Sequence, residues 1–128
     1  MYFNKGKFIE LVKKLPEKKF RVLDEKHEKI TLVLDPGEAG IIKIIKAPSA
    51  YGIMFDHWGA TFNVNSLYIL KLDGFTEYVS DEPVQPDDEH ERLFEYKIVN
   101  SIDIIVYNQD TIQHEYKVDY RAIEIDFE

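Results

Sequence analysis

The sequence predicts an α+β fold that is mostly β, with one N-terminal helix packed on a curled antiparallel sheet or sandwich. Three observations lead to this prediction. Apolar residues near the start recur with the spacing of a helix, the chain after Pro16 changes to the period of a strand, and an Asp-Gly pair at 73–74 separates two strand-like segments. With 128 residues and 45% hydrophobic composition, the chain has the size and apolar content of one domain, which we assign to residues 1–128.

The helix is expected at residues 4–15. Its apolar side chains are spaced i, i+3, i+4 and i+7, so they share one face; they are Phe8, Leu11, Val12 and Leu15. Asn4 suits the position that caps the start, and Pro16 ends the helix. This segment supplies the α part of the predicted fold.

Short segments rich in β-branched and aromatic residues follow, separated by turn residues. Residues 25–28 are interpreted as a polar turn, and residues 56–59 as a stretch between two strand-like runs. Asp73 and Gly74 suit a type I′ turn, because both central positions of that turn require a positive φ. The expected strands lie near 20–24, 30–34, 41–46, 53–55, 61–64, 68–72, 75–79, 92–99, 102–107 and 112–127.

Two further features concern the last third of the chain. Residues 80–91 contain two prolines and six acidic residues, so we expect an exposed and mobile loop there. In the long final strand the apolar residues change parity at Ala122 and Ile123, which predicts a bulge or bend at that point.

Charge is divided unevenly along the chain. Residues 1–30 carry nine Lys or Arg against five Asp or Glu, residues 31–72 carry three of each, and residues 73–128 carry four basic against sixteen acidic residues. The net charge of the whole chain is −8. Because an acidic surface repels phosphate, this balance disfavours nucleic-acid binding and favours a basic protein as partner.

No motif of catalysis or cofactor binding is visible. The chain has no cysteine, its six glycines form no phosphate-binding loop, and its serines lie in no nucleophile motif. The four histidines, at 27, 57, 90 and 114, show no H-x-x-x-H spacing. We therefore expect no enzyme, no metal and no cofactor. With no leader and no long apolar segment visible, we also expect a cytoplasmic protein without a membrane partner.

The first functional hypothesis is a small acidic protein that neutralises or regulates a basic partner, in the manner of an immunity protein or a phage inhibitor. The partner would be a basic protein such as a toxin or a nuclease. Tyrosines among carboxylates make an adhesive surface with electrostatic steering. The residues expected on that surface are Tyr96, Tyr107, Tyr116, Asp119, Tyr120, Glu124 and Asp126.

The alternative hypothesis is a small-molecule-binding or enzymatic β-domain with a site near Asp56, His57 and Trp58. This stretch combines a carboxylate, an imidazole and the single tryptophan of the chain. Tryptophan offers a large apolar surface and one N–H donor, which suits the wall of a pocket. A third possibility is a subunit of a larger assembly that pairs through an exposed strand edge.

Overall fold

The computed structural model describes residues 20–83 and 98–127, and this part of the chain contains β-strands and no helix. The α+β prediction is therefore wrong, because the described protein is all-β. The helix predicted at 4–15 lies outside the described residues. The strands are β1 (Phe20–Leu34), β2 (Ala39–Ile45), β3 (Gly52–Ala60), β4 (Ser66–Leu72), β5 (Phe75–Ser80), β6 (Ile98–Val99), β7 (Ser101–Asn108) and β8 (His114–Phe127).

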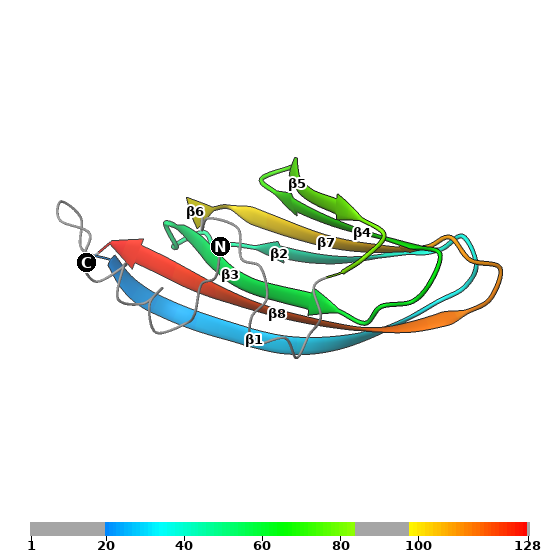
Figure 1. Cartoon of the computed structure of the whole chain (residues 1–128). Helices are drawn as coiled ribbons and strands as arrows, with labels where there is room; N and C mark the ends of the chain where they lie inside the picture. The colour runs from blue at the N-terminus through cyan, green and yellow to red at the C-terminus, as the bar shows by residue number, and fades with distance from the viewer. Residues whose placement is uncertain (1–19, 84–97, 128) are drawn as a thin grey trace.

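The strands form two antiparallel sheets that lie one above the other (Figure 1). Sheet A has the order β1-β8-β3-β6, and sheet B has the order β2-β7-β4-β5. The antiparallel pairing is as the sequence predicts, and of the two arrangements left open, a curled sheet or a sandwich, the structure has the sandwich. β8 lies between β1 and β3, so its two edges are both paired within sheet A.

The core fills the space between the two sheets. Alternate residues of β8, β3, β7 and β4 point into it, as expected for strands with one face against a core. The face of sheet A that points away from sheet B is called its outer face below. The largest core side chains that are fully buried are Ile53, Phe55, Tyr68, Leu70, Ile102, Ile104, Val106 and Tyr116.

The hairpin predicted at 73–74 is confirmed. Asp73 (φ 52°) and Gly74 (φ 81°) join β4 to β5, and both have the positive φ that a type I′ turn requires. The carboxylate of Asp73 also accepts hydrogen bonds from the backbone N–H groups of Asn100 (2.7 Å) and Ser101 (3.0 Å). The turn is thereby tied to the start of β7.

Two segments interpreted as connections lie inside strands. Residues 25–28 belong to β1, and residues 56–59 belong to β3, whereas 61–64 form a loop and turn. Each of these two errors has its own cause. β1 is an edge strand and β3 is bulged, so each carries polar residues that a regular central strand would exclude.

The bulges of sheet A lie in the partners of β8 and not in β8 itself. One extra residue, Leu23, interrupts the register of β1, and another, Asp56, interrupts that of β3 opposite Ala122. β8 keeps a regular alternation, and its two apolar sets are buried on opposite faces of the sheet. Of the bulge or bend predicted near Ala122 and Ile123, the bulge is therefore not found in β8, because burial of both faces removes the need for one.

Two other expectations fall largely outside the described residues. Of the loop expected at 80–91, only 80–83 are described, and of the strand expected at 92–99, only Ile98–Val99. In the described ranges no helix has the length and apolar character that a membrane span needs.

Candidate metal centre

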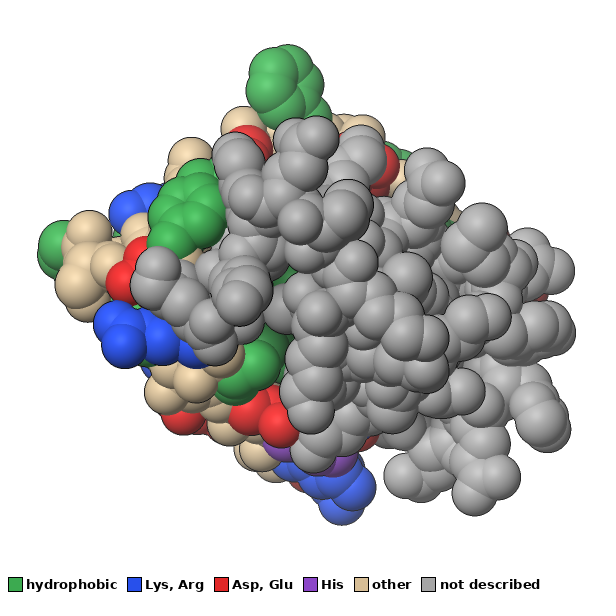
Figure 2. Space-filling model, turned by 90° about the vertical axis from the view of Figure 1, so that its left-hand side faces the viewer, with side chains coloured by type: hydrophobic (Ala, Val, Ile, Leu, Met, Phe, Trp, Pro, Cys, Tyr) green, Lys and Arg blue, Asp and Glu red, His purple; other side chains and the backbone are tan. Residues whose placement is uncertain are grey.

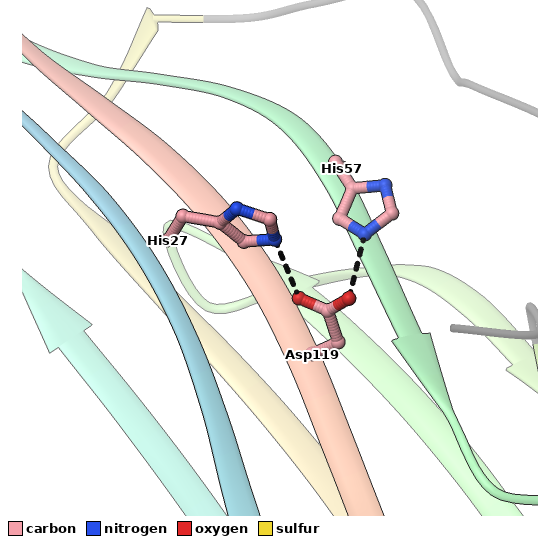
Figure 3. Close-up of side chains that lie close together, drawn as sticks. All are labelled: His27, His57 and Asp119. Atoms are coloured by element: carbon pink, nitrogen blue, oxygen red, sulfur yellow. Dashed lines mark hydrogen bonds and ion pairs between the residues drawn. The ribbon is translucent and has the colours of Figure 1, made fainter. Parts of the chain in front are cut away.

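Three side chains capable of binding a metal converge on the outer face of sheet A. They are His27 of β1, His57 of β3 and Asp119 of β8, and one ligand atom from each lies within 4.8 Å of the other two. Figure 3 shows the two imidazoles pointing at the carboxylate from either side. We call these three residues the His–Asp–His cluster.

The pairing of three strands creates this cluster. His27 and His57 are both the Cα partners of Arg121, one on each side of β8. Asp119 lies two residues further along β8, so its side chain shares the face of Arg121. The partner of Asp119 on β3 is Gly59, which has no side chain to occupy the space beside the carboxylate.

The bulge at Asp56 decides the face on which His57 lies. Before the bulge, Phe55 points into the core; after it, Trp58 and Ala60 do so. If Asp56 instead occupied a regular pairing position, the alternation of the strand would place His57 in the core and Trp58 outside. The bulge therefore places the imidazole beside Asp119 and also buries the indole, which is 2% exposed.

The distances within the cluster are close to those of a metal site. Nε2 of His27 lies 3.0 Å from Oδ1 of Asp119, and Nε2 of His57 lies 3.4 Å from Oδ2. In a tetrahedral zinc site with bonds of about 2.0–2.1 Å, two donor atoms are about 3.3 Å apart. Both nitrogen–oxygen separations are near that value, although each nitrogen faces a different oxygen of the carboxylate, and the centroids of the two imidazole rings are 5.9 Å apart.

Exposure differs across the cluster. The side chain of Asp119 is 5% exposed, that of His57 is 14% exposed and that of His27 is 53% exposed. On the same face, the neighbouring rows of β8 and β3 place fully buried apolar side chains next to the cluster; these are Met54, Ile123 and Ile125. The buried carboxylate of Asp119 requires a cationic or hydrogen-bonding partner, and the two histidines provide it. The cluster meets solvent at the edge strand β1, through the half-exposed side chain of His27.

A second His–Asp pair lies elsewhere and has a different character. Nε2 of His114 and Oδ2 of Asp110 are 2.8 Å apart, at the junction of β7 and β8. The hydrogen bonds with His114 and with the backbone N–H of Thr111 lower the pKa of Asp110 below its usual range. Among the described residues no third His, Cys, Asp or Glu joins this pair, so it supports the loop conformation and serves as a control.

Two tyrosines expected on the partner surface lie in the core instead. Tyr116 is fully buried and shares a 2.5 Å hydrogen bond with the hydroxyl of Ser66. Tyr120 is 4% exposed and donates a hydrogen bond to Glu28. Burial raises the pKa of Tyr120 to about 12, and the bond to Glu28 contributes to the rise.

The other residues expected on that surface lie on different parts of the molecule. Tyr107 is on sheet B, and the side chain of Tyr96 lies outside the described residues. Glu124 and Asp126 are partly exposed near the end of β8, on the opposite face from Asp119. The described members are therefore not gathered on one surface, and a basic partner stays a prediction from charge.

The residues of the alternative site are also separated. His57 lies on the outer face, whereas Trp58 packs in the core with its ring 5.3 Å from that of Tyr78. The structure describes only the backbone of Asp56, at the bulge. Of this stretch, His57 alone takes part in the His–Asp–His cluster.

The sequence interpretation missed the cluster because it placed both histidines in connections between strands. One signal was present. The last segment, 112–127, reads as a very long strand, and a long strand needs a partner of similar length. Only the union of 20–24 and 30–34 into one strand supplies such a partner, and that union places His27 on the sheet.

A comparison of this chain with protein-family models, with curated proteins and with solved structures finds no match. Its function therefore has to be inferred from the site itself.

Proposed function

We propose that this protein binds a divalent transition-metal ion, with zinc as the first candidate, through the His–Asp–His cluster. The observation that carries the proposal is the convergence of His27, His57 and Asp119 from three strands to within 4.8 Å. Two imidazoles and one carboxylate form a familiar donor set for Zn²⁺ and Fe²⁺. Calcium and magnesium prefer all-oxygen sites, so this set disfavours them.

The cluster supplies too few donor atoms to fill the coordination shell of a metal ion, so a bound ion could take a further ligand. Three protein donors leave at least one position of a tetrahedral ion for water or an exogenous molecule. No fourth His, Cys, Asp or Glu of the described chain belongs to the cluster. His27 is half exposed on an edge strand, so the cluster meets solvent on the side of β1.

A structural ion pair is the competing explanation of the same contacts. Two histidines beside Asp119 would neutralise a buried carboxylate without any metal. The two explanations differ in one measurable property. An ion pair takes up no zinc, whereas a metal site binds one ion per chain.

The test is isothermal titration of zinc into the metal-free, tag-free protein. We expect one ion per chain, and we expect His27→Ala and His57→Ala each to weaken binding by about 100-fold or more, since each removes one of three donors. His114→Ala is the matched control, because it removes a histidine that contacts a carboxylate outside the cluster. Circular dichroism verifies that each variant is folded.

His27 is half exposed, so its loss should leave the fold intact and make the result interpretable. Absence of zinc binding by the folded wild-type protein would refute the proposal. Equal binding by wild type and His27→Ala, or loss of binding in His114→Ala, would also refute it.

A further inference from the structure

We propose that two copies of this protein pack face to face through sheet B and form a two-fold symmetric dimer. The interface is the face of sheet B that points away from sheet A. The inference is independent of the proposed metal site, which lies on sheet A.

One apolar row crosses all four strands of sheet B on this face. Ile105 of β7 has Ile41 of β2 and Ile69 of β4 as its Cα partners. Ile69 is paired in turn with Val79 of β5. The two outer members of the row are widely exposed, Ile41 at 60% and Val79 at 55%. A sheet face in contact with water normally carries polar side chains, so a continuous apolar row marks a surface that another apolar surface covers.

The neighbouring row continues the apolar surface. Tyr107 of β7 is the Cα partner of Ala39 and Leu67, and alternation along the strands places all three on the face of Ile105. We call these two rows the apolar face. In Figure 2, hydrophobic side chains reach the surface at the top of the molecule, where Figure 1 shows sheet B.

The row on the other side of Ile105 carries charges of alternating sign. Asp103 of β7 lies between its Cα partners Lys43 of β2 and Lys71 of β4. Oδ1 of Asp103 is buried without a hydrogen bond, and its ion pair with Nζ of Lys43 is 3.9 Å long. Two other carboxylates are near this face. Glu77, at the register shift of β5, already has a partner within the chain, and Asp81 follows the last residue of β5.

A two-fold axis that runs parallel to the strands, between β7 and β4, matches both kinds of row. It places β7 of one copy over β4 of the other and each row over the same row. Ile105 then faces Ile69 of the second copy, and Asp103 faces Lys71 of the second copy. An axis across the strands would instead place the charged row over the row of Tyr107, which buries charges against apolar groups. The order of the charges therefore selects the first axis.

The size of the face suits a dimer that dissociates. β2 and β4 have seven residues each, and β7 has eight. With about 3.4 Å per residue and about 4.8 Å between strands, the face measures about 24 by about 19 Å. Interdigitating side chains bury more area than this projection, which brings the face near the roughly 600 Å² per copy of small specific interfaces. We therefore expect a reversible equilibrium between monomer and dimer.

The test is sedimentation velocity of the metal-free protein over a wide range of concentration. Ile41→Lys places a charge in the apolar row and should weaken dimerisation by about tenfold or more. Because Ile41 is mostly exposed, this variant should stay folded. Val33→Lys is the matched control, since it changes a valine that is 54% exposed on β1 of sheet A, and it should leave dimerisation unchanged.

Two charge variants test the symmetry. Asp103→Lys has lysine at both facing positions, and Lys71→Asp has aspartate at both, so each should dimerise at least about tenfold more weakly than wild type. An equal mixture of the two should form a heterodimer with an affinity within about threefold of wild type, because each lysine then faces an aspartate. Circular dichroism verifies that each variant is folded.

Three results would overturn the inference. The first is a wild-type protein that stays monomeric at every concentration. The second is a dimer that keeps its affinity in Ile41→Lys, which would mean that another surface, such as an edge strand, makes the contact. The third is a mixture of the two folded charge variants that forms no heterodimer.

Discussion

His27 and His57 lie on strands that do not pair with each other, yet both are Cα partners of Arg121 on the strand between them. The relationship sets a condition on the site. The cluster exists only when β1, β8 and β3 are all paired in this register. Anything that shifts one of these strands by a residue removes one donor from the outer face.

Zinc should stabilise the folded protein. An ion that binds only the native state at about 100 times its Kd raises the free energy of unfolding by about 2.7 kcal/mol, which for a domain of this size raises the Tm by roughly 10 °C. Thermal unfolding followed by circular dichroism, with and without zinc, measures this shift. Asp119→Asn should lose most of this rise in Tm, whereas His114→Ala should retain it. Calcium should leave the Tm of the wild-type protein unchanged. An equal shift in Asp119→Asn would contradict the assignment.

The bulge at residue 56 contains one residue more than the pairing of β3 with β8 needs. Deletion of Asp56 closes the bulge and keeps the alternation, because Phe55 and Trp58 still face the core and His57 still faces outward beside Asp119. We therefore expect a zinc affinity within about threefold of wild type and a change of less than about 1 kcal/mol in the free energy of unfolding. Denaturant unfolding and zinc titration measure the two effects.

The control for the deletion is Asp56→Ala, which keeps the number of residues in the strand and thus the bulge. It should bind zinc as wild type does. A folded deletion variant that no longer binds zinc would show that the bulge positions His57 in a way that strand alternation alone does not.

Local chemistry allowed the sequence to predict the hairpin at Asp73 and Gly74. The requirement for positive φ falls on two adjacent residues, and the structure confirms both. The long first strand could not be recognised in the same way. Its middle is polar because β1 is an edge strand, and local polarity alone resembles a turn.

The cluster is non-local, and no spacing in the chain predicts it. His27, His57 and Asp119 are far apart in sequence and meet only through strand register and one bulge. The residues expected on an acidic surface do not lie together, because local alternation along β8 places Tyr116 and Tyr120 in the core.

Gly74→Ala should destabilise the protein by about 1 kcal/mol, because residue 74 has a φ of 81° that non-glycine residues rarely adopt. Denaturant unfolding measures the change. Asp73→Asn is the companion variant and should cost less than about 0.5 kcal/mol, since asparagine tolerates this backbone region and keeps an acceptor oxygen. A neutral Gly74→Ala substitution would mean that the hairpin adopts another turn type in solution.

The stability of the protein should depend on Tyr120 at alkaline pH. Its pKa in the folded state is raised to about 12, above the value of 10.0 for a free phenol. The phenol therefore stabilises the fold fully below about pH 10, and this contribution is lost as the pH rises toward 12. Tyr120→Phe lacks the ionisable group, so its unfolding free energy should fall less steeply than that of wild type between about pH 10 and about pH 12. Parallel slopes for the two proteins would contradict the raised pKa.

The most direct test of the central claim is a crystal structure of the zinc-soaked protein, with the ion located by anomalous scattering. We expect one ion on the outer face of sheet A, bonded at about 2.0–2.2 Å to Nε2 of His27, Nε2 of His57 and a carboxylate oxygen of Asp119. An ion found only at His114 and Asp110, or a cluster that keeps its His–Asp contacts without any ion at saturating zinc, would contradict the claim.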